Sequence, residues 1–134
     1  MVEVFAFACR HKDRPEWQET IYNAQNAGKA RYQFWLDVTE PYPDTKLIDL
    51  RVRKLGKPRA NEMFRHVARS RGMPDLEPGE RIMSAHGDGV IVDAGGGACF
   101  TVIFDTGKWA GQRLSIHPSE FTRCSTVGKS GDGK

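Results

Sequence analysis

Four side chains in the last third of the chain have the chemistry that acid–base catalysis uses, and they are His86, Asp88, Asp105 and His117. A histidine beside a carboxylate can take up and release a proton near neutral pH. No hydroxyl or thiol near them has the setting of an activated nucleophile on a sharp strand-to-helix turn. Turns commonly use Asp for hydrogen bonds to the backbone, and a histidine directly before Pro118 fits a structural corner. The sequence therefore predicts a protein that is not an enzyme.

The glycines and cysteines do not indicate a reaction centre either. Gly95–Gly97 is not followed by the Lys-Ser/Thr pair and helix of a phosphate-binding loop, so a flexible hairpin turn is predicted. Cys9, Cys99 and Cys124 are widely spaced and form no Cys-x-x-Cys pair, which disfavours a disulfide scaffold or a zinc site. Cys9 and His11 would need two further metal ligands from distant parts of the chain. We expect free thiols in a reducing compartment, without a metal or a cofactor.

A short basic segment is the sharpest functional signal. Residues 51–71 carry eight Lys or Arg and one acid, a net charge of +7, whereas the whole chain of 134 residues has a net charge of +3. Arginines at alternate positions of a strand, or on successive turns of a helix, can contact several phosphates from one surface. The candidate binding residues of this segment are Arg51, Arg53, Lys54, Lys57, Arg59, Arg65, Arg69 and Arg71.

Three interpretations of this segment stay open: a nucleic-acid contact, a landing site for an acidic protein, and a solvated face paired with the acidic residues that follow. Residues 76–124 carry four Lys or Arg and six Asp or Glu, a net charge of −2. Lys108 and Trp109 are further candidates, because an exposed loop tryptophan beside a lysine suits base stacking or a protein contact. The alternative is that Trp109 folds back as a lid.

The elements that must position these residues begin with a strand and two helical stretches. Val2–Ala8 alternates as a strand does, and residues 10–14 form a polar loop. Pro15 and the acids after it suit the start of a helix running towards Ala27. A second helix is predicted over Lys29–Val38. It is apolar on more than one side, so it is covered by its own fold or by a partner.

A second strand and a third helix complete this part. In Leu47–Leu55 one face holds Ile48, Leu50 and Val52, and the other holds Arg51 and Arg53, which predicts a sheet with one covered and one basic face.

The third helix is predicted over Ala60–Ser70. Its buried stripe is Met63, Phe64 and Val67, and Gly72 is its C-cap. Residues 1–72 are thus predicted to form a small β-α-α-β-α domain with a basic face.

After a linker at 73–77, residues 78–125 contain five short strands separated by glycine-rich turns. These strands are predicted near 81–85, 89–93, 99–105, 112–117 and 122–125, with a 3₁₀ turn at 118–120. The pattern predicts an α+β chain whose second domain is a small closed barrel. Residues 126–134 are rich in Gly, Ser and Lys and are predicted to be a disordered tail.

This second domain resembles the SH3-like barrels of the KOW and Tudor groups. The resemblance lies in Pro78-Gly79-Glu80-Arg81-Ile82, in the turn and strand of residues 86–92, in the strand Val102-Ile103-Phe104-Asp105, and in the 3₁₀ corner before the last strand. It covers about a third of the chain. It implies a binding module, as in regulators that dock on RNA polymerase, and it carries over no catalytic residue.

The whole chain also resembles uncharacterised small proteins of bacteriophages and mobile elements, through residues 30–38 and 48–54. This resemblance suggests a phage context and supplies no activity. Together with the basic segment at 51–71, it leads to the hypothesis of a phage-encoded, non-enzymatic regulatory protein that engages nucleic acid or a nucleoprotein complex through the basic face. The alternative is an inhibitor or adaptor that acts by protein–protein contact, such as an anti-defence protein that blocks a host complex.

The composition, 39% hydrophobic and 28% charged, is that of a globular protein. No apolar run approaches the roughly 20 residues that a membrane helix needs. The first residues, which include Glu3, lack the pattern of a secretion signal. We expect a protein of the bacterial host cytoplasm.

Overall fold

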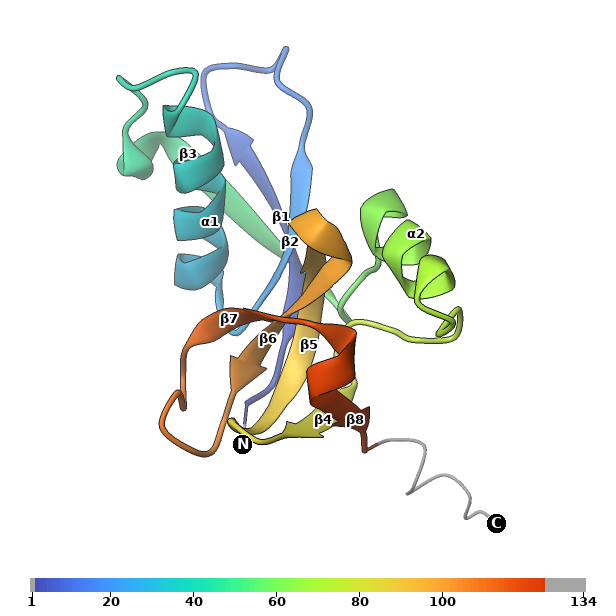
Figure 1. Ribbon diagram of the computed structural model, residues 1–134. Helices are drawn as coiled ribbons and strands as arrows, with labels where there is room; N and C mark the ends of the chain where they lie inside the picture. The colour runs from blue at the N-terminus through green and yellow to red at the C-terminus, as the bar shows by residue number, and fades with distance from the viewer. Residues whose placement is uncertain (1, 125–134) are drawn as a thin grey trace. The chain divides into compact units, whose positions relative to one another are not determined.

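The computed structural model describes residues 2–124 (Figure 1). It contains two α-helices and two antiparallel sheets, one of three strands and one of five, which confirms the predicted α+β class. The chain divides into two compact units. We call residues 4–59 the three-stranded unit, and residues 2–3 together with 60–124 the five-stranded unit. The predicted tail at 126–134 lies outside the described residues.

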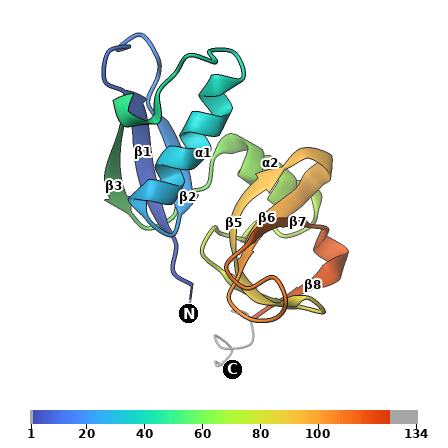
Figure 2. The same cartoon turned by 90° about the vertical axis from the view of Figure 1, so that its left-hand side faces the viewer.

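The three-stranded unit is an antiparallel sheet with a helix on one face. The strand order is β2-β1-β3, so β1 is central. Figures 1 and 2 show α1 lying along one face of this sheet. Its elements are β1 (Phe5–His11), β2 (Thr20–Ala24), α1 (Ala27–Thr39), a 3₁₀ turn η1 (Leu47–Asp49) and β3 (Leu50–Gly56).

The core of this unit follows the strand period of two. Phe7 and Cys9 of β1 and Leu50 of β3 face α1, which buries Phe34 and Ala30 against them. The helix begins where Asn26 accepts a hydrogen bond from the backbone N–H of Lys29 (2.9 Å), so Gly28 lies inside its first turn. The helix predicted over 29–38 is therefore confirmed in position.

The helix predicted from Pro15 to Ala27 is wrong. Residues 12–19 form a loop, and Thr20–Ala24 is a strand that pairs antiparallel with Phe5–Cys9. Thr20, Ile21 and Tyr22 are β-branched or aromatic residues, which favour a strand once a partner strand is beside them. The unit order is therefore β-β-α-β before the last helix, not β-α-α-β.

The predicted buried face of the second strand is right for Leu50 and wrong for Ile48. β3 alternates between its two faces, with Leu50 buried and Arg51 and Arg53 exposed. Ile48 lies in the 3₁₀ turn before the strand and is 78% exposed. The strand period does not extend into this turn.

The five-stranded unit combines one helix with an antiparallel sheet of order β7-β6-β5-β4-β8. The helix α2 packs on β5. The elements are α2 (Glu62–Ser70), β4 (Arg81–Ser84), β5 (Gly87–Gly95), η2 (Gly96–Ala98), β6 (Cys99–Phe104), β7 (Arg113–Ile116), η3 (Pro118–Glu120) and β8 (Phe121–Arg123).

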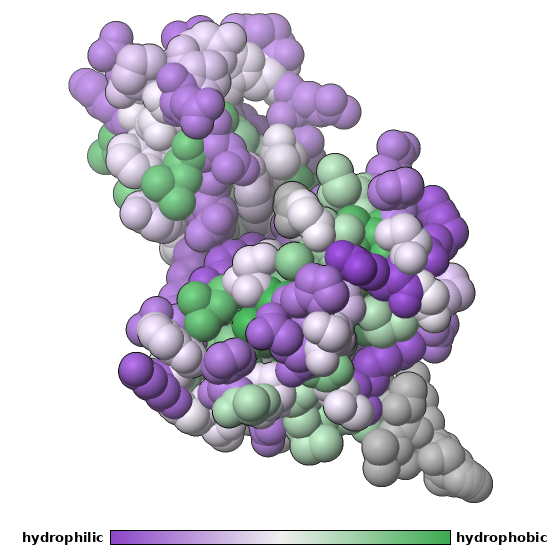
Figure 3. Space-filling model, in the orientation of Figure 1, coloured by the Kyte–Doolittle hydropathy of each residue, from purple (hydrophilic) through white to green (hydrophobic). Residues whose placement is uncertain are grey.

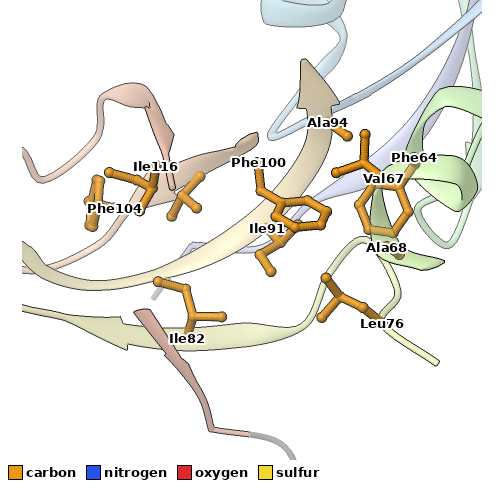
Figure 4. Packing of buried hydrophobic residues seen from close by; sticks show 11 residues of the cluster. Phe64, Val67, Ala68, Leu76, Ile82, Ile91, Ala94, Phe100, Phe104 and Ile116 are labelled. Atoms are coloured by element: carbon orange, nitrogen blue, oxygen red, sulfur yellow. The ribbon is translucent and has the colours of Figure 1, made fainter. Parts of the chain in front are cut away.

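The core of this unit runs along the sheet, and α2 packs on one end of it (Figure 4). Phe64 of α2 meets Phe100 of β6 edge-on, with ring centroids 5.5 Å apart. Val67 and Ala68 complete the buried face of α2, whereas Met63, predicted to be buried, is 53% exposed. Because the helix period is 3.6, a stripe through Phe64, Val67 and Ala68 leaves Met63 at its edge. Gly72 has φ +76°, as the residue after a helix C-cap needs.

Two glycines allow the tight turns of the five-stranded sheet to meet. A Cβ on Gly87 would lie 2.4 Å from the backbone oxygen of Thr106, and one on Gly107 would lie 2.4 Å from that of His86. Both have positive φ, a conformation that L side chains rarely adopt. The glycine-rich pattern thus reflects backbone packed against backbone.

The expectation of a closed barrel in the second domain needs correction. The described pairing leaves β7 and β8 as the two edges of an open sheet, so the predicted closed barrel is not formed. The expected boundary at 73–77 also differs from the division of the chain, in which α2 belongs to the five-stranded unit. The burial of Phe64 against Phe100 is the physical reason, because it joins α2 to this sheet's core.

Candidate nucleic-acid interface

One face of the three-stranded sheet is opposite α1 and carries three exposed arginines. Arg10 of β1 stands directly opposite Arg51 of β3, and Arg53 is opposite Ala8. Since neighbours on one face of a strand are two residues apart, Arg10 and Ala8 share a face with Arg51 and Arg53. We call Arg10, Arg51 and Arg53 the arginine face. All three side chains are exposed to solvent.

The arginine face keeps most of its positive charge. Arg53 forms an ion pair with Glu19 (3.0 Å). Arg51 Nη1 donates to the backbone oxygens of Ile48 (2.8 Å) and Leu50 (3.3 Å), which orients the guanidinium without neutralising it. The Arg10 side chain has no hydrogen-bond or ion-pair partner in residues 2–124. Like charges directly opposite on two strands destabilise a sheet, so this arrangement carries a cost in stability.

The other basic residues of this unit do not join the arginine face. Lys54 alternates to the α1 side, where its Nζ lies 3.8 Å from the centroid of the Phe5 ring. Lys57 and Arg59 follow β3 and are exposed. The backbone of Arg59 is held by the side-chain amide of Asn23, through bonds of 2.8 Å and 2.9 Å.

The arginines of α2 and its C-cap, Arg65, Arg69 and Arg71, belong to the five-stranded unit, and two of the three are engaged within it. Arg65 forms a two-pronged ion pair with Glu77 (2.7 Å and 3.1 Å), and this hydrogen bonding raises the pKa of Arg65 above its usual value. Arg71 donates to the backbone oxygens of Ala98 (3.0 Å) and Gly97 (3.3 Å). Arg69 is exposed. The segment 51–71 is therefore divided between two units.

Trp109 packs against the core of the five-stranded unit and is half-buried. Lys108 Nζ lies 5.2 Å from the centroid of its ring. This geometry favours the interpretation in which Trp109 folds back on its own unit over the one in which it is fully exposed for base stacking.

Sequence reasoning missed Arg10, because it placed residues 10–14 in a loop. β1 continues through His11, which brings Arg10 opposite Arg51. The available signal was the alternation of Phe7, Cys9 and His11 with Ala8 and Arg10, which extends the strand period past the predicted end.

Of the four acid–base residues, Asp105 has its side chain in an ion pair and His117 has its side chain in a helix cap. Asp105 pairs with Arg81 (2.7 Å) and also accepts a hydrogen bond from the N–H of Val2 (3.4 Å). His117 Nδ1 accepts the N–H of Ser119 (3.1 Å), and so caps η3. The backbone N–H of Asp88 donates to Thr106 Oγ1 (2.8 Å), and the side chain of His86 is exposed. Over residues 2–124, no three His, Cys, Asp or Glu side chains are grouped as metal ligands would be.

Comparison with known proteins adds no homologue to this picture: no protein-family model, no curated protein and no solved structure matches the chain. Within the described residues, neither helix has the length and apolar character needed to cross a membrane.

Proposed function

We propose that this chain is a non-enzymatic regulatory protein, phage-encoded, that binds nucleic acid through the arginine face of its three-stranded unit. The observation that carries the proposal is the cross-strand pair of Arg10 and Arg51, two exposed cations opposed on one sheet face. This pair of like charges does not stabilise the sheet, so folding alone does not explain its presence. A polyanion that contacts both guanidinium groups removes the repulsion and releases counterions.

The distribution of charge between the units supports the same conclusion. Residues 4–59 carry eleven Lys or Arg and seven Asp or Glu, a net charge of +4. Residues 60–124 carry seven and eight, a net charge of −1. A phosphate backbone is therefore attracted to the three-stranded unit rather than to the five-stranded unit.

For the five-stranded unit we propose an SH3-like protein-docking module or rigid support. The support is its succession of four antiparallel strands, a 3₁₀ turn and a fifth strand that returns to the first. With its negative charge, it would contribute contacts to the protein part of a nucleoprotein complex.

The test of the proposed function is a titration of fluorescent single-stranded and duplex oligonucleotides, both DNA and RNA, across salt concentrations. We expect binding at about 50 mM salt that weakens steeply as salt increases. Arg10→Glu should weaken binding and lower the slope of log affinity against log salt by about 1. The same change should raise stability by about 0.2–1 kcal/mol, because it creates an opposite-charge pair with Arg51.

Arg69→Glu is the matched control, since it makes the same charge change at an exposed position of the five-stranded unit. It should leave the affinity close to that of the unaltered protein. If no oligonucleotide binds at low salt, the proposed function is wrong. If Arg69→Glu weakens binding as much as Arg10→Glu does, the assignment to the arginine face is wrong.

A second candidate function is the inhibitor or adaptor that acts by protein–protein contact. The observation in its favour is the outer face of α1, where Tyr32 and Leu36 are exposed one turn apart. Figure 3 shows hydrophobic surface interspersed with hydrophilic surface on the drawn face of this unit. Affinity capture from nuclease-treated host lysate tests this candidate. A partner retained by the unaltered protein and lost with Leu36→Glu would support it, and no partner would count against it.

A further inference from the structure

A cavity of about 580 Å³ lies at one end of the three-stranded unit. It is open to solvent and is lined by the loop between β1 and β2 and by the segment between α1 and β3. These two connections meet at the same end of the sheet (Figures 1 and 2). The lining residues that matter below are His11, Arg14, Tyr42, Asp44, Lys46 and Asp49. This volume is within the range of small-molecule sites and is ample for one nucleobase.

One wall of the cavity is an aromatic surface. Tyr42 is 49% exposed, and its ring packs on Trp17 with centroids 4.8 Å apart and planes inclined by 35°. The Arg14 guanidinium lies 5.0 Å from the centroid of Trp17 and 5.8 Å from that of Tyr42. Trp17 supports the Tyr42 ring, and Tyr42 lines the cavity with an exposed aromatic side chain of the kind on which bases stack.

The polar groups of the cavity suit a neutral ligand with hydrogen-bonding edges. His11 is only 8% exposed, and its Nδ1 accepts the N–H of Asp13 (3.1 Å). Because Nδ1 accepts this hydrogen bond, Nε2 is the donor of the ring, and it has no hydrogen-bond partner in residues 2–124. Asp44 and Lys46 supply an acceptor and a donor and have no ion-pair partner in that range.

The charge of the lining excludes a phosphate as the preferred occupant. Three carboxylates line the cavity, those of Asp13, Asp44 and Asp49, against the two cations of Arg14 and Lys46. Asp49 and Asp13 are partly compensated by Lys12, at 3.5 Å and 4.0 Å, and Arg14 is partly compensated by Glu16, at 3.8 Å. A nearly neutral cavity favours a base, whereas the uncompensated arginine face favours a phosphate.

The cavity and the arginine face adjoin each other in the chain. Arg10 precedes His11, and Arg51 bonds to the backbone oxygen of Ile48, the residue before Asp49. A nucleotide chain carries its bases on one side and its phosphates on the other. One strand can therefore place a base in the cavity and its phosphates on the arginine face.

We propose that the ligand is a single-stranded nucleic acid that inserts one base into this cavity, against Tyr42, while its phosphates lie on the arginine face. The inference rests on the proposed function and specifies its substrate class. A base within a duplex is stacked and paired and cannot enter such a cavity without being flipped out, which costs a few kcal/mol.

The test compares Tyr42→Ala with Tyr32→Ala in titrations of a mixed-sequence single-stranded oligonucleotide and of its duplex. The control is closely matched, because Tyr32 is also 49% exposed and also packs on a tryptophan, Trp35. Tyr42→Ala should weaken single-strand binding about tenfold, and Tyr32→Ala should leave it unchanged. The salt slope of Tyr42→Ala should stay that of the unaltered protein, because no phosphate contact is lost.

Two results would overturn the inference while leaving the proposed function in place. One is equal affinity for the single strand and its duplex, and the other is equal behaviour of the two tyrosine variants. In either case Arg10→Glu would still weaken binding. Absence of binding by every oligonucleotide would instead overturn the proposed function, and the inference with it.

Discussion

Two arginines of the five-stranded unit are neutralised by carboxylates, whereas two arginines of the three-stranded unit are not, within residues 2–124. In the five-stranded unit, Arg123 pairs with Asp75 and Glu80 at 3.0 Å, and Arg81 pairs with Asp105 at 2.7 Å. In the three-stranded unit, Arg10 and Arg51 have no carboxylate partner among the described residues. The count of basic residues does not reveal this difference. Arginines that are neutralised by carboxylates hold a fold together, whereas arginines left with their charge are available to a polyanion.

The most sensitive test of this difference is to replace one arginine in each unit and to compare the losses of stability. Arg123→Met takes the cation from Glu80, whose side chain is 11% exposed, and should lower the free energy of unfolding by about 3 kcal/mol. Arg53→Met breaks the exposed pair with Glu19 and should cost less than about 1 kcal/mol. Urea denaturation followed by circular dichroism measures both changes. Equal costs would show that the arginines of the two units have the same structural role.

The cysteines give a second comparison. Burial raises the pKa of the Cys9 thiol to about 11, above its ordinary value of 9.0. Because the folded state resists ionisation of this thiol, stability is full below pH 9 and should fall by about 1 kcal/mol per pH unit between pH 9 and 11. Burial also raises the pKa of Cys124 in the five-stranded unit, but that residue is half-buried.

Cys9→Ala removes the contribution of this thiol, so its stability should fall less steeply over pH 9–11 than that of the unaltered protein. At pH 8 a thiol reagent should modify Cys124 in the native protein and leave Cys9 unmodified. Modification of Cys9 at the rate seen in urea would contradict its burial in the core of the three-stranded unit.

The smallest expected effect concerns a feature that both units share. Asn26 accepts the N–H of Lys29 at the start of α1, and Asn61 accepts the N–H of Phe64 at the start of α2 (2.9 Å and 2.8 Å). Replacing either asparagine by alanine should cost about 1 kcal/mol, measured by urea denaturation. Similar losses of stability would show that the two helices begin in the same way and that the units differ in how their arginines are paired. A much larger loss for one asparagine would show that the helices themselves also differ.

Short-range patterns in the sequence determined much of this protein. The residues from 60 onward show period 3.6 around Phe64 and Val67, then glycines at the turns between short alternating runs, and all of these elements are present. The exposed basic side of β3 also follows from the alternation of Leu50 and Val52 with Arg51 and Arg53. Such patterns depend on each segment having one covered face, which is a local property.

The tertiary structure decided what depends on partners far along the chain. Residues 20–24 are a strand because β1 pairs with them, and Arg10 reaches the arginine face because β1 continues to pair with β3. Glu77 pairs with Arg65 and Asp105 pairs with Arg81, although the partners lie 12 and 24 residues apart in the sequence. No local pattern therefore distinguishes an arginine that is neutralised in the fold from one that can bind a ligand. The sequence thus determined which residues are charged and which faces are apolar. Strand pairing and long-range ion pairs decided which charges remain for a ligand, because both depend on backbone and carboxylate groups that only the folded chain brings together.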